Sequence, residues 1–120
     1  MAISKSYRDL IVWQKSIELT GKIYSCTRKF PKDEMYGIIS QMRRAAVSIA
    51  SNIAEGQGRN STGEFRQFLG TSKGSLYELE TQLIVSQNVG YLSKEELNDL
   101  LSICAEIGRL INGLIKSLEQ

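Results

Sequence analysis

The side chains with the clearest chemistry in this sequence are arginines placed around one apolar stretch. Arg43 and Arg44 precede a run of small and branched apolar residues, and Arg59 follows that run after a Glu-Gly-Gln-Gly segment. A guanidinium group can form two parallel hydrogen bonds with one phosphate, so such residues suit a nucleic-acid backbone. Arg8 and Lys15 lie closer to the N-terminus and add two cations. All five are predicted to contact nucleic acid.

The same cations have a second interpretation, in which they only pair with acids of the protein itself. Glu78, Glu80 and Glu106 are candidate partners on neighbouring helices. Glu55 and Arg59 have the i, i+4 spacing of an ion pair on one helix face. Both interpretations, phosphate binding and internal pairing, stay open at the level of sequence.

Aromatic side chains that could stack on the bases of a single strand are Tyr7, Trp13 and Tyr36. Trp13 falls on an apolar stripe, so a structural role is favoured for it. Charge is also distributed unevenly. Residues 1–60 carry ten Lys/Arg and five Asp/Glu, which gives +5, and residues 61–120 carry five and eight, which gives −3. This asymmetry indicates either a basic face or complementary charges on neighbouring helices.

Catalytic chemistry is not indicated. The sequence has no histidine, which removes the His-dependent nucleophiles and the usual zinc and di-iron ligand sets. The glycines near Arg59 lack the Gly-Lys-Ser/Thr of a phosphate-binding loop. Cys26 and Cys104 have apolar neighbours and are expected to be buried thiols rather than a disulfide. We therefore expect a non-enzyme without catalytic residues, metal or cofactor.

Length and composition bound the class of protein. At 120 residues and 42% hydrophobic, the chain fits one globular domain, residues 1–120. No apolar run approaches the roughly 20 residues of a membrane-spanning helix, and the first ten residues lack the apolar core of a signal peptide. We expect a cytoplasmic protein without a membrane partner.

Apolar residues recur at spacings of three and four along most of the chain, which predicts helices over about 9–30, 34–57, 62–88 and 93–118. Short connections favour antiparallel neighbours, so the predicted fold is all-α, an up-down-up-down four-helix bundle. Ser93 and Glu96 predict a capping box at the last helix. The predicted stripe of the first helix is Leu10, Trp13, Ile17, Thr20, Tyr24 and Thr27, widened by Leu19, Ile23 and Phe30.

The second predicted helix has more apolar surface than one bundle seam uses. Gly70 and Gly74 repeat the small-residue spacing in the third helix, where each glycine lowers helix propensity by about 1 kcal/mol. Close packing should compensate, either inside the bundle or between subunits. Subunits arranged around an axis would repeat each arginine and build a ring of positive potential. The predicted oligomer interface comprises Val47, Ser48, Ala50, Ser51 and Ala54.

Motifs along nearly the whole chain give a family resemblance. The most specific is the block Asn52 to Gly56 followed by Gly58-Arg59; the others are Trp13, Lys29-Phe30-Pro31, Tyr36-Gly37, Gln41 to Ala45, Ser48, Phe65, Gly74-Ser75, Glu78, Glu80 and Gly90-Tyr91-Leu92. Together they resemble the 23S ribosomal RNA intervening-sequence proteins, a bacterial four-helix bundle family similar to the accessory protein of diversity-generating retroelements.

The resemblance implies a barrel-like homopentamer with a positively charged character that binds nucleic acid, without enzymatic activity. Arg43, Arg44 and Arg59 match the basic motif of the family. The leading hypothesis is a homo-oligomer, a pentamer by this resemblance, that binds RNA or single-stranded DNA through phosphates, beside a reverse transcriptase or a ribosomal precursor. The alternative is a protein-interaction scaffold with no nucleic-acid role.

Overall fold

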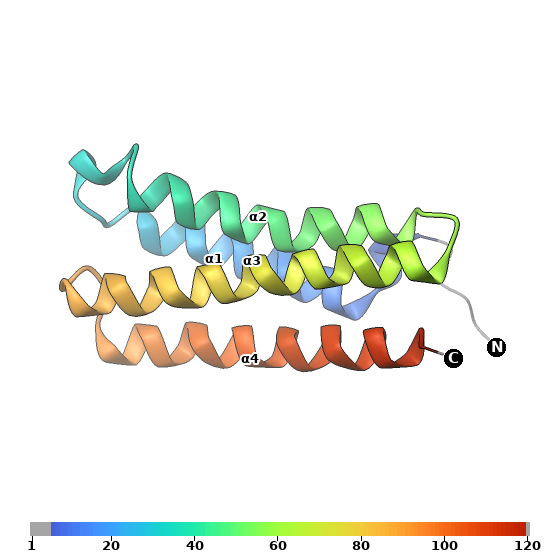
Figure 1. The fold of residues 1–120 in the computed structure, drawn as a ribbon. Helices are drawn as coiled ribbons and strands as arrows, with labels where there is room; N and C mark the ends of the chain where they lie inside the picture. The colour runs from blue at the N-terminus through green and yellow to red at the C-terminus, as the bar shows by residue number, and fades with distance from the viewer. Residues whose placement is uncertain (1–5, 120) are drawn as a thin grey trace.

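Four long helices make up the computed structural model, which describes residues 6–119. They are α1 (Ile11–Thr27), α2 (Ile38–Gln57), α3 (Thr62–Asn88) and α4 (Lys94–Ser117), with short 3-10 turns η1 (Tyr7–Asp9) and η2 (Lys32–Glu34). The chain reverses direction at each connection, and both termini lie at the same end of the molecule (Figure 1). The predicted all-α four-helix bundle is confirmed.

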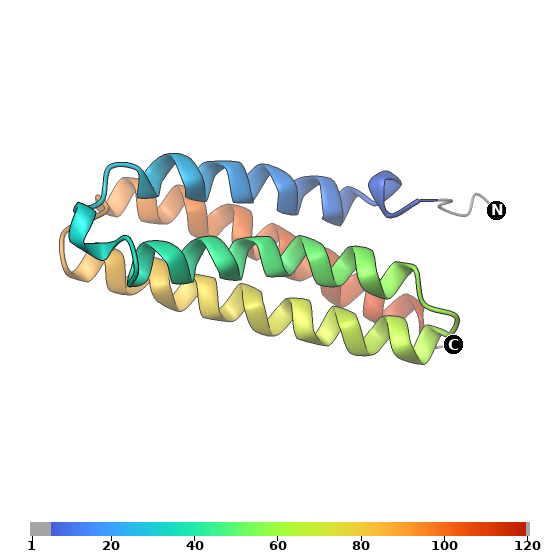
Figure 2. The same cartoon turned by 90° about the horizontal axis from the view of Figure 1, so that it is seen from above.

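The helices enclose a single core along the long axis. Contacts join α1 to α2, α2 to α3, α3 to α4, and α4 back to α1, so every helix has two neighbours (Figure 2). In α2 the apolar residues at helical spacing were predicted to face the core, and all five are buried: Ile39, Met42, Ala46, Ile49 and Ile53. The largest fully buried side chains are Leu19, Ile23, Ile39, Met42, Ile49, Ile53, Leu69, Leu76, Leu79, Leu83, Ile107 and Ile111.

The buried face of α1 agrees only in part with the predicted one, because Leu19, Ile23, Thr27 and Phe30 are buried as predicted but the main predicted row is not the core row. The core residues recur as Val12, Ser16, Leu19, Ile23 and Cys26, whereas Ile17 of the predicted stripe is 47% exposed. The two rows are offset by one residue, which corresponds to about 100° around a helix. The large apolar side chains of Trp13 and Ile17 led to the prediction of the other row. The actual face contains a serine, and its hydroxyl is accommodated because it donates to the Val12 carbonyl at 2.7 Å.

Helix ends follow local chemistry, and two predicted boundaries were wrong. Helix α1 ends at Thr27 rather than residue 30, because the N–H groups of Lys29 and Phe30 donate to carbonyls three residues back and Pro31 disfavours helical backbone at Phe30. Helix α2 begins at Ile38 rather than residue 34, since η2 intervenes and Gly37 has φ −110° and ψ −121°, outside the helical region. Helix α3 matches its predicted bounds, with the Ser61 side chain accepting from the backbone of Glu64.

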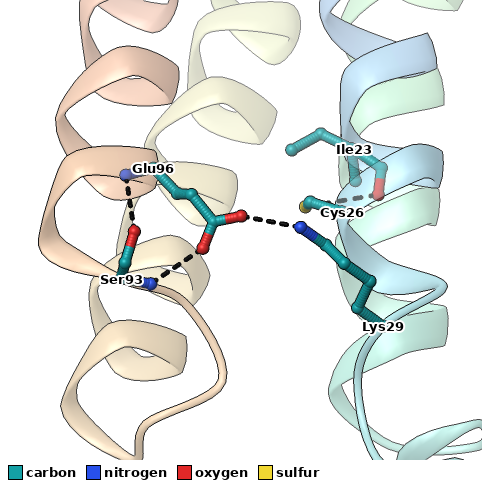
Figure 3. A network of polar contacts seen from close by, with 5 residues as sticks. All are labelled: Ile23, Cys26, Lys29, Ser93 and Glu96. Atoms are coloured by element: carbon teal, nitrogen blue, oxygen red, sulfur yellow. Dashed lines mark hydrogen bonds and ion pairs between the residues drawn. The ribbon is translucent and has the colours of Figure 1, made fainter.

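The capping box predicted for α4 is confirmed. The Glu96 backbone N–H donates to Ser93 Oγ at 3.0 Å, and the Ser93 backbone N–H donates to Glu96 Oε1 at 2.9 Å. The other carboxylate oxygen of Glu96 accepts from Lys29 Nζ at 2.8 Å, just beyond α1 (Figure 3). One carboxylate thus caps α4 and links it to the end of α1.

Helices α2 and α3 are joined by polar contacts between small side chains. Ser72 Oγ donates to the Ile49 carbonyl at 2.8 Å, and the hydroxyls of Ser48 and Ser75 lie 2.8 Å apart. The tightest approach is at Gly56, where an added Cβ would lie 2.7 Å from the Cβ of Phe68. These contacts fix the separation of the two helices.

Gly70 and Gly74 do not provide the close packing inside the bundle that the sequence allowed. Both are exposed, and a Cβ added at either would meet nothing within 4 Å. Packing of these two glycines between subunits stays a prediction. No helix in the described part of the chain is long and apolar enough to cross a membrane.

Candidate nucleic-acid interface

Arg43 is held in place by the end of α1. Its Nε donates to Thr27 Oγ1 at 3.0 Å, and its guanidinium carbon lies 4.6 Å from the centre of the Tyr24 ring. Thr27 is buried and its hydroxyl donates in turn to the Ile23 carbonyl at 2.7 Å. The terminal nitrogens of Arg43 make no hydrogen bond among the described residues, so a positioned guanidinium keeps donors available for an anion.

Arg44 is exposed and makes neither an ion pair nor a hydrogen bond with any residue in the range 6–119. It stands between two hollows on the surface of α2. The arginine groove, of about 450 Å³, is lined by Tyr24, Arg43, Arg44, Val47, Ser48 and Ser51. The second hollow, of about 470 Å³, lies towards α3 and has both Arg44 and Glu78 in its lining.

The chemistry of the arginine groove suits an anion. Two guanidinium groups and the exposed Ser51 supply hydrogen-bond donors around one hollow, and no carboxylate contributes to its lining. Charge-assisted hydrogen bonds from arginine to phosphate are stronger than neutral ones. The ring of Tyr24 supports the guanidinium group of Arg43, although the sequence analysis placed Tyr24 only on an apolar stripe. The two residues belong to different helices, so no spacing in the sequence indicates their contact.

The structure does not gather the five predicted cations on one face. Arg8 lies in η1 and Arg59 follows α2, so both are at the end of the bundle that carries the termini (Figure 1). Arg43 and Arg44 belong to the half of α2 nearer the opposite end. Lys15 is directed towards α4, where its Nζ lies 3.4 Å from Glu106 Oε2.

Internal pairing accounts for some of these cations and not for others. The predicted Glu55–Arg59 pair is confirmed, with Arg59 Nη2 3.1 Å from Glu55 Oε2. The Arg59 guanidinium also lies 4.7 Å from the ring centre of Phe68. Arg43 and Arg44 pair with none of the acids considered for them. The pair Arg43 and Arg44 is therefore the strongest anion site among the predicted residues.

The predicted oligomer residues line a different, apolar hollow. Val47, Ala50, Ser51 and Ala54 form the α2 wall of a groove of about 270 Å³. The remaining lining residues of this α1–α2 groove are Tyr7, Trp13, Ile17 and Thr20. The fifth predicted residue, Ser48, lies in the arginine groove and is tied to Ser75.

Accessible apolar surface in the α1–α2 groove comes mainly from two side chains. Ile17 is 47% exposed and Val47 is 43% exposed, one on each helix. Ala50, by contrast, is only 5% exposed and mostly serves the contact inside the bundle. Trp13 packs against the core and its ring meets that of Tyr7 at 5.1 Å, edge to face. Residues from α1 that sequence periodicity assigned to the core thus form the wall of a surface groove.

The described residues do not bring a set of metal-ligating side chains together. No cluster of three or more His, Cys, Asp or Glu side chains lies close enough to hold a metal ion. Cys26 and Cys104 are free and buried, as predicted. Burial raises the pKa of the Cys26 thiol to about 11 and that of Cys104 to about 12. Burial also raises the pKa of Glu80 above its ordinary value.

The bundle, with its paired arginines on α2, has a counterpart among known sequences. The model of the family described as 23S rRNA-intervening sequence protein matches residues 8–113. The chain belongs to this family. The resemblance inferred from the Asn52–Gly56 block and the other motifs is confirmed.

A solved structure of an S23 ribosomal protein family member has the same fold. This protein of unknown function, from Bacteroides thetaiotaomicron, superposes with a TM-score of 0.79 at 24% sequence identity. The similarity covers 88% of this chain and 99% of that one. At this identity the comparison shows the fold. No curated protein matches the chain.

Proposed function

We propose that this member of the 23S rRNA-intervening sequence family is a non-enzymatic homo-oligomer that binds RNA or single-stranded DNA through phosphates at the arginine groove. The observation that carries the proposal is the arrangement of Arg43 and Arg44. The first guanidinium is oriented by Thr27 and Tyr24, and the second is exposed without a partner in the described structure. Two guanidinium groups around one hollow without a carboxylate favour an anionic ligand.

The α1–α2 groove supports the assembly part of the proposal. Ile17 and Val47 expose apolar surface on both of its walls, beside the small residues of α2. A second copy would cover this surface, and the family resemblance puts the number of copies at five. Val47 and Ser51 line both the α1–α2 groove and the arginine groove. Assembly would therefore bring copies of Arg43 and Arg44 near the subunit boundary, where their potentials add.

The arginine side chains are better suited to bind the phosphate backbone of a nucleic acid than to recognise a specific base sequence. Phosphate contacts from arginine position a protein on nucleic acid and carry no sequence information. The family description points to ribosomal RNA as the source of that backbone, and a ribosomal precursor is our proposed partner. A reverse transcriptase is the partner suggested by the retroelement relatives of the family.

Fluorescence anisotropy with labelled single-stranded RNA and DNA at two salt concentrations tests this function. We expect saturable binding that weakens as salt rises, because the protein displaces counterions from the backbone. Arg44→Ala should weaken binding and reduce the salt slope, whereas Arg109→Ala, which removes an exposed arginine on α4, should change neither. Absence of saturable binding at low salt, or binding indifferent to salt, contradicts the proposal.

A protein-interaction scaffold is the second candidate, favoured by the use of Lys15 and Arg59 in internal ion pairs. Charge reversal of Arg43 and Arg44 to glutamate separates the two functions. Intact oligomers with weakened nucleic-acid binding support the first, and loss of assembly in size-exclusion chromatography with light scattering supports the scaffold. The same measurement on the wild-type chain tests assembly itself, since a stable monomer in dilute solution would remove the basis of the ring.

A further inference from the structure

The turn between α1 and α2 presents an aromatic ring that nothing in the described chain covers. Tyr36 is 97% exposed, the highest value among the large apolar and aromatic side chains, and its neighbour Met35 is 43% exposed. The turn projects at the end of the bundle opposite the termini (Figure 1). A tyrosine ring offers a large flat surface with two side-chain torsions, so it gains contact area on a ligand at low entropic cost.

Tyr36 lies on a turn whose backbone is held by hydrogen bonds. The backbone N–H groups of Glu34 and Met35 donate to the carbonyls of Pro31 and Lys32 at 3.0 and 3.1 Å, and the Gly37 N–H donates to the Glu34 carbonyl at 3.0 Å. These three hydrogen bonds close the segment that leads into α2.

Side chains fasten the same turn to the rest of the bundle. Tyr91 Oη donates to Glu34 Oε2 at 2.7 Å, and the rings of Phe30 and Tyr91 lie 5.2 Å apart. Phe30 is only 4% exposed. The segment that leads to Tyr36 is therefore anchored through Phe30 and Glu34, whereas the Tyr36 ring itself remains in solvent.

Charges of both signs lie near the exposed ring, because Asp33 and Glu34 precede it on the turn and several cations lie at the same end of the bundle. Arg28 and Lys32 are exposed on the same turn and have no ion-pair partner among residues 6–119, whereas Lys29 is neutralised by Glu96. Arg43 reaches this end of the bundle as well, because it is hydrogen-bonded to Thr27, the last residue of α1. Cations that would attract phosphates thus lie at the same end of the bundle as the aromatic ring.

We propose that Tyr36 is a stacking platform for an unpaired base of a strand whose phosphates contact the arginine groove. This inference rests on the proposed function and narrows its ligand to single-stranded nucleic acid. Bases inside a duplex are stacked on one another and offer only their edges, whereas a single strand can place a base flat against an exposed ring. Stacking tolerates any base, in keeping with backbone-directed binding.

The test compares Tyr36→Ala, Tyr36→Trp and the matched control Tyr77→Ala, which removes a half-exposed tyrosine from α3. Each full-length protein is titrated with labelled polyuridine and with a labelled RNA duplex. Loss of one stacked base weakens binding by roughly five- to one-hundred-fold. We expect that loss for Tyr36→Ala with polyuridine, near wild-type affinity for Tyr36→Trp and Tyr77→Ala, and an unchanged salt slope in all three.

A direct readout is photocrosslinking of a 5-iodouridine-substituted strand, which should attach to Tyr36 in peptide mass spectrometry. If Tyr36→Ala binds polyuridine as the wild type does while Arg44→Ala binds more weakly, stacking is wrong and the phosphate function stands. If the wild type binds no nucleic acid, both fail. If Tyr36→Ala lowers the molar mass in light scattering, the ring is a subunit contact and the stacking role is overturned.

Discussion

Glu96 joins two helix ends through one carboxylate, because Lys29 Nζ lies 2.8 Å from its Oε2 while its Oε1 caps α4 (Figure 3). The hydrogen bond from Lys29, followed by the backbone hydrogen bond from Ser93, lowers the pKa of Glu96 from its ordinary value of 4.5 to about 2. The same contact raises the pKa of Lys29 above 10.5. The α1–α4 junction is therefore sensitive to pH at both extremes.

The Glu96 junction predicts a specific pH dependence of stability. The folded pKa of Glu96 is lower than its unfolded value, so its contribution is complete above pH 4.5 and is lost as pH falls towards 2. Urea unfolding at neutral pH and at pH values within this window should show a smaller difference for Glu96→Gln than for the wild type. The carboxylate is partly exposed, so we expect a modest effect. Glu95→Gln, on the first turn of α4, serves as the control.

Ser93 supplies the side-chain cap of α4. Replacing it with alanine removes the hydrogen bond to the Glu96 N–H and should lower the free energy of unfolding by about 1 kcal/mol. Thermal or urea unfolding measures the loss. Ser102→Ala, at an exposed position inside α4, removes a hydroxyl without a capping role and should change stability little. Equal effects of the two substitutions would argue against the cap.

Gly56 is a packing constraint between α2 and α3. An alanine there would place its Cβ 2.7 Å from Phe68 Cβ and 3.0 Å from Phe65 Cδ1. Overpacking of this kind costs roughly 1–3 kcal/mol, which exceeds the gain of about 1 kcal/mol in helix propensity. Gly21→Ala, where an added Cβ meets nothing within 4 Å, should instead stabilise α1. Opposite signs in urea unfolding are the expected result.

Gly70 and Gly74 report on assembly. An added Cβ has open space at both positions, so Gly→Ala should raise the stability of an isolated subunit by up to about 1 kcal/mol each. If another subunit packs against this face of α3, the same substitutions should weaken the oligomer. Light scattering across a dilution series separates the outcomes. Oligomers that persist unchanged would show that this face is not a subunit contact.

The two cysteines should be unreactive in the native protein. Burial raises the thiol pKa to about 11 for Cys26 and about 12 for Cys104, so little thiolate exists at neutral pH. Ellman's reagent should react slowly with the folded chain and fully after denaturation. Rapid reaction of one thiol without denaturant would indicate local opening of α1 or α4.

The sequence alone predicted most of the fold because apolar residues at helical spacing bury together. The bounds of α3, the capping box of α4 and the core stripe of α2 were all read correctly. The main predicted row of α1 was wrong by about 100°, although Leu19 and Ile23 of the widened stripe are buried, because the real core row includes Ser16, whose hydroxyl bonds to its own helix. The pairing of Glu55 with Arg59 was predictable because the two residues are four apart in the sequence, although Arg59 lies just beyond the end of α2.

Only the tertiary structure distinguished the predicted cations that form internal ion pairs from those that do not. Whether Lys15 meets Glu106, or whether Arg43 rests on Tyr24 and Thr27, depends on how α1 packs against α4 and α2. Such contacts join residues far apart in the chain. Helical periodicity predicts which face of a helix is buried, but it does not predict which helix packs against that face. Local spacing thus determined the helices, and packing decided which guanidinium groups remain available to bind an anion.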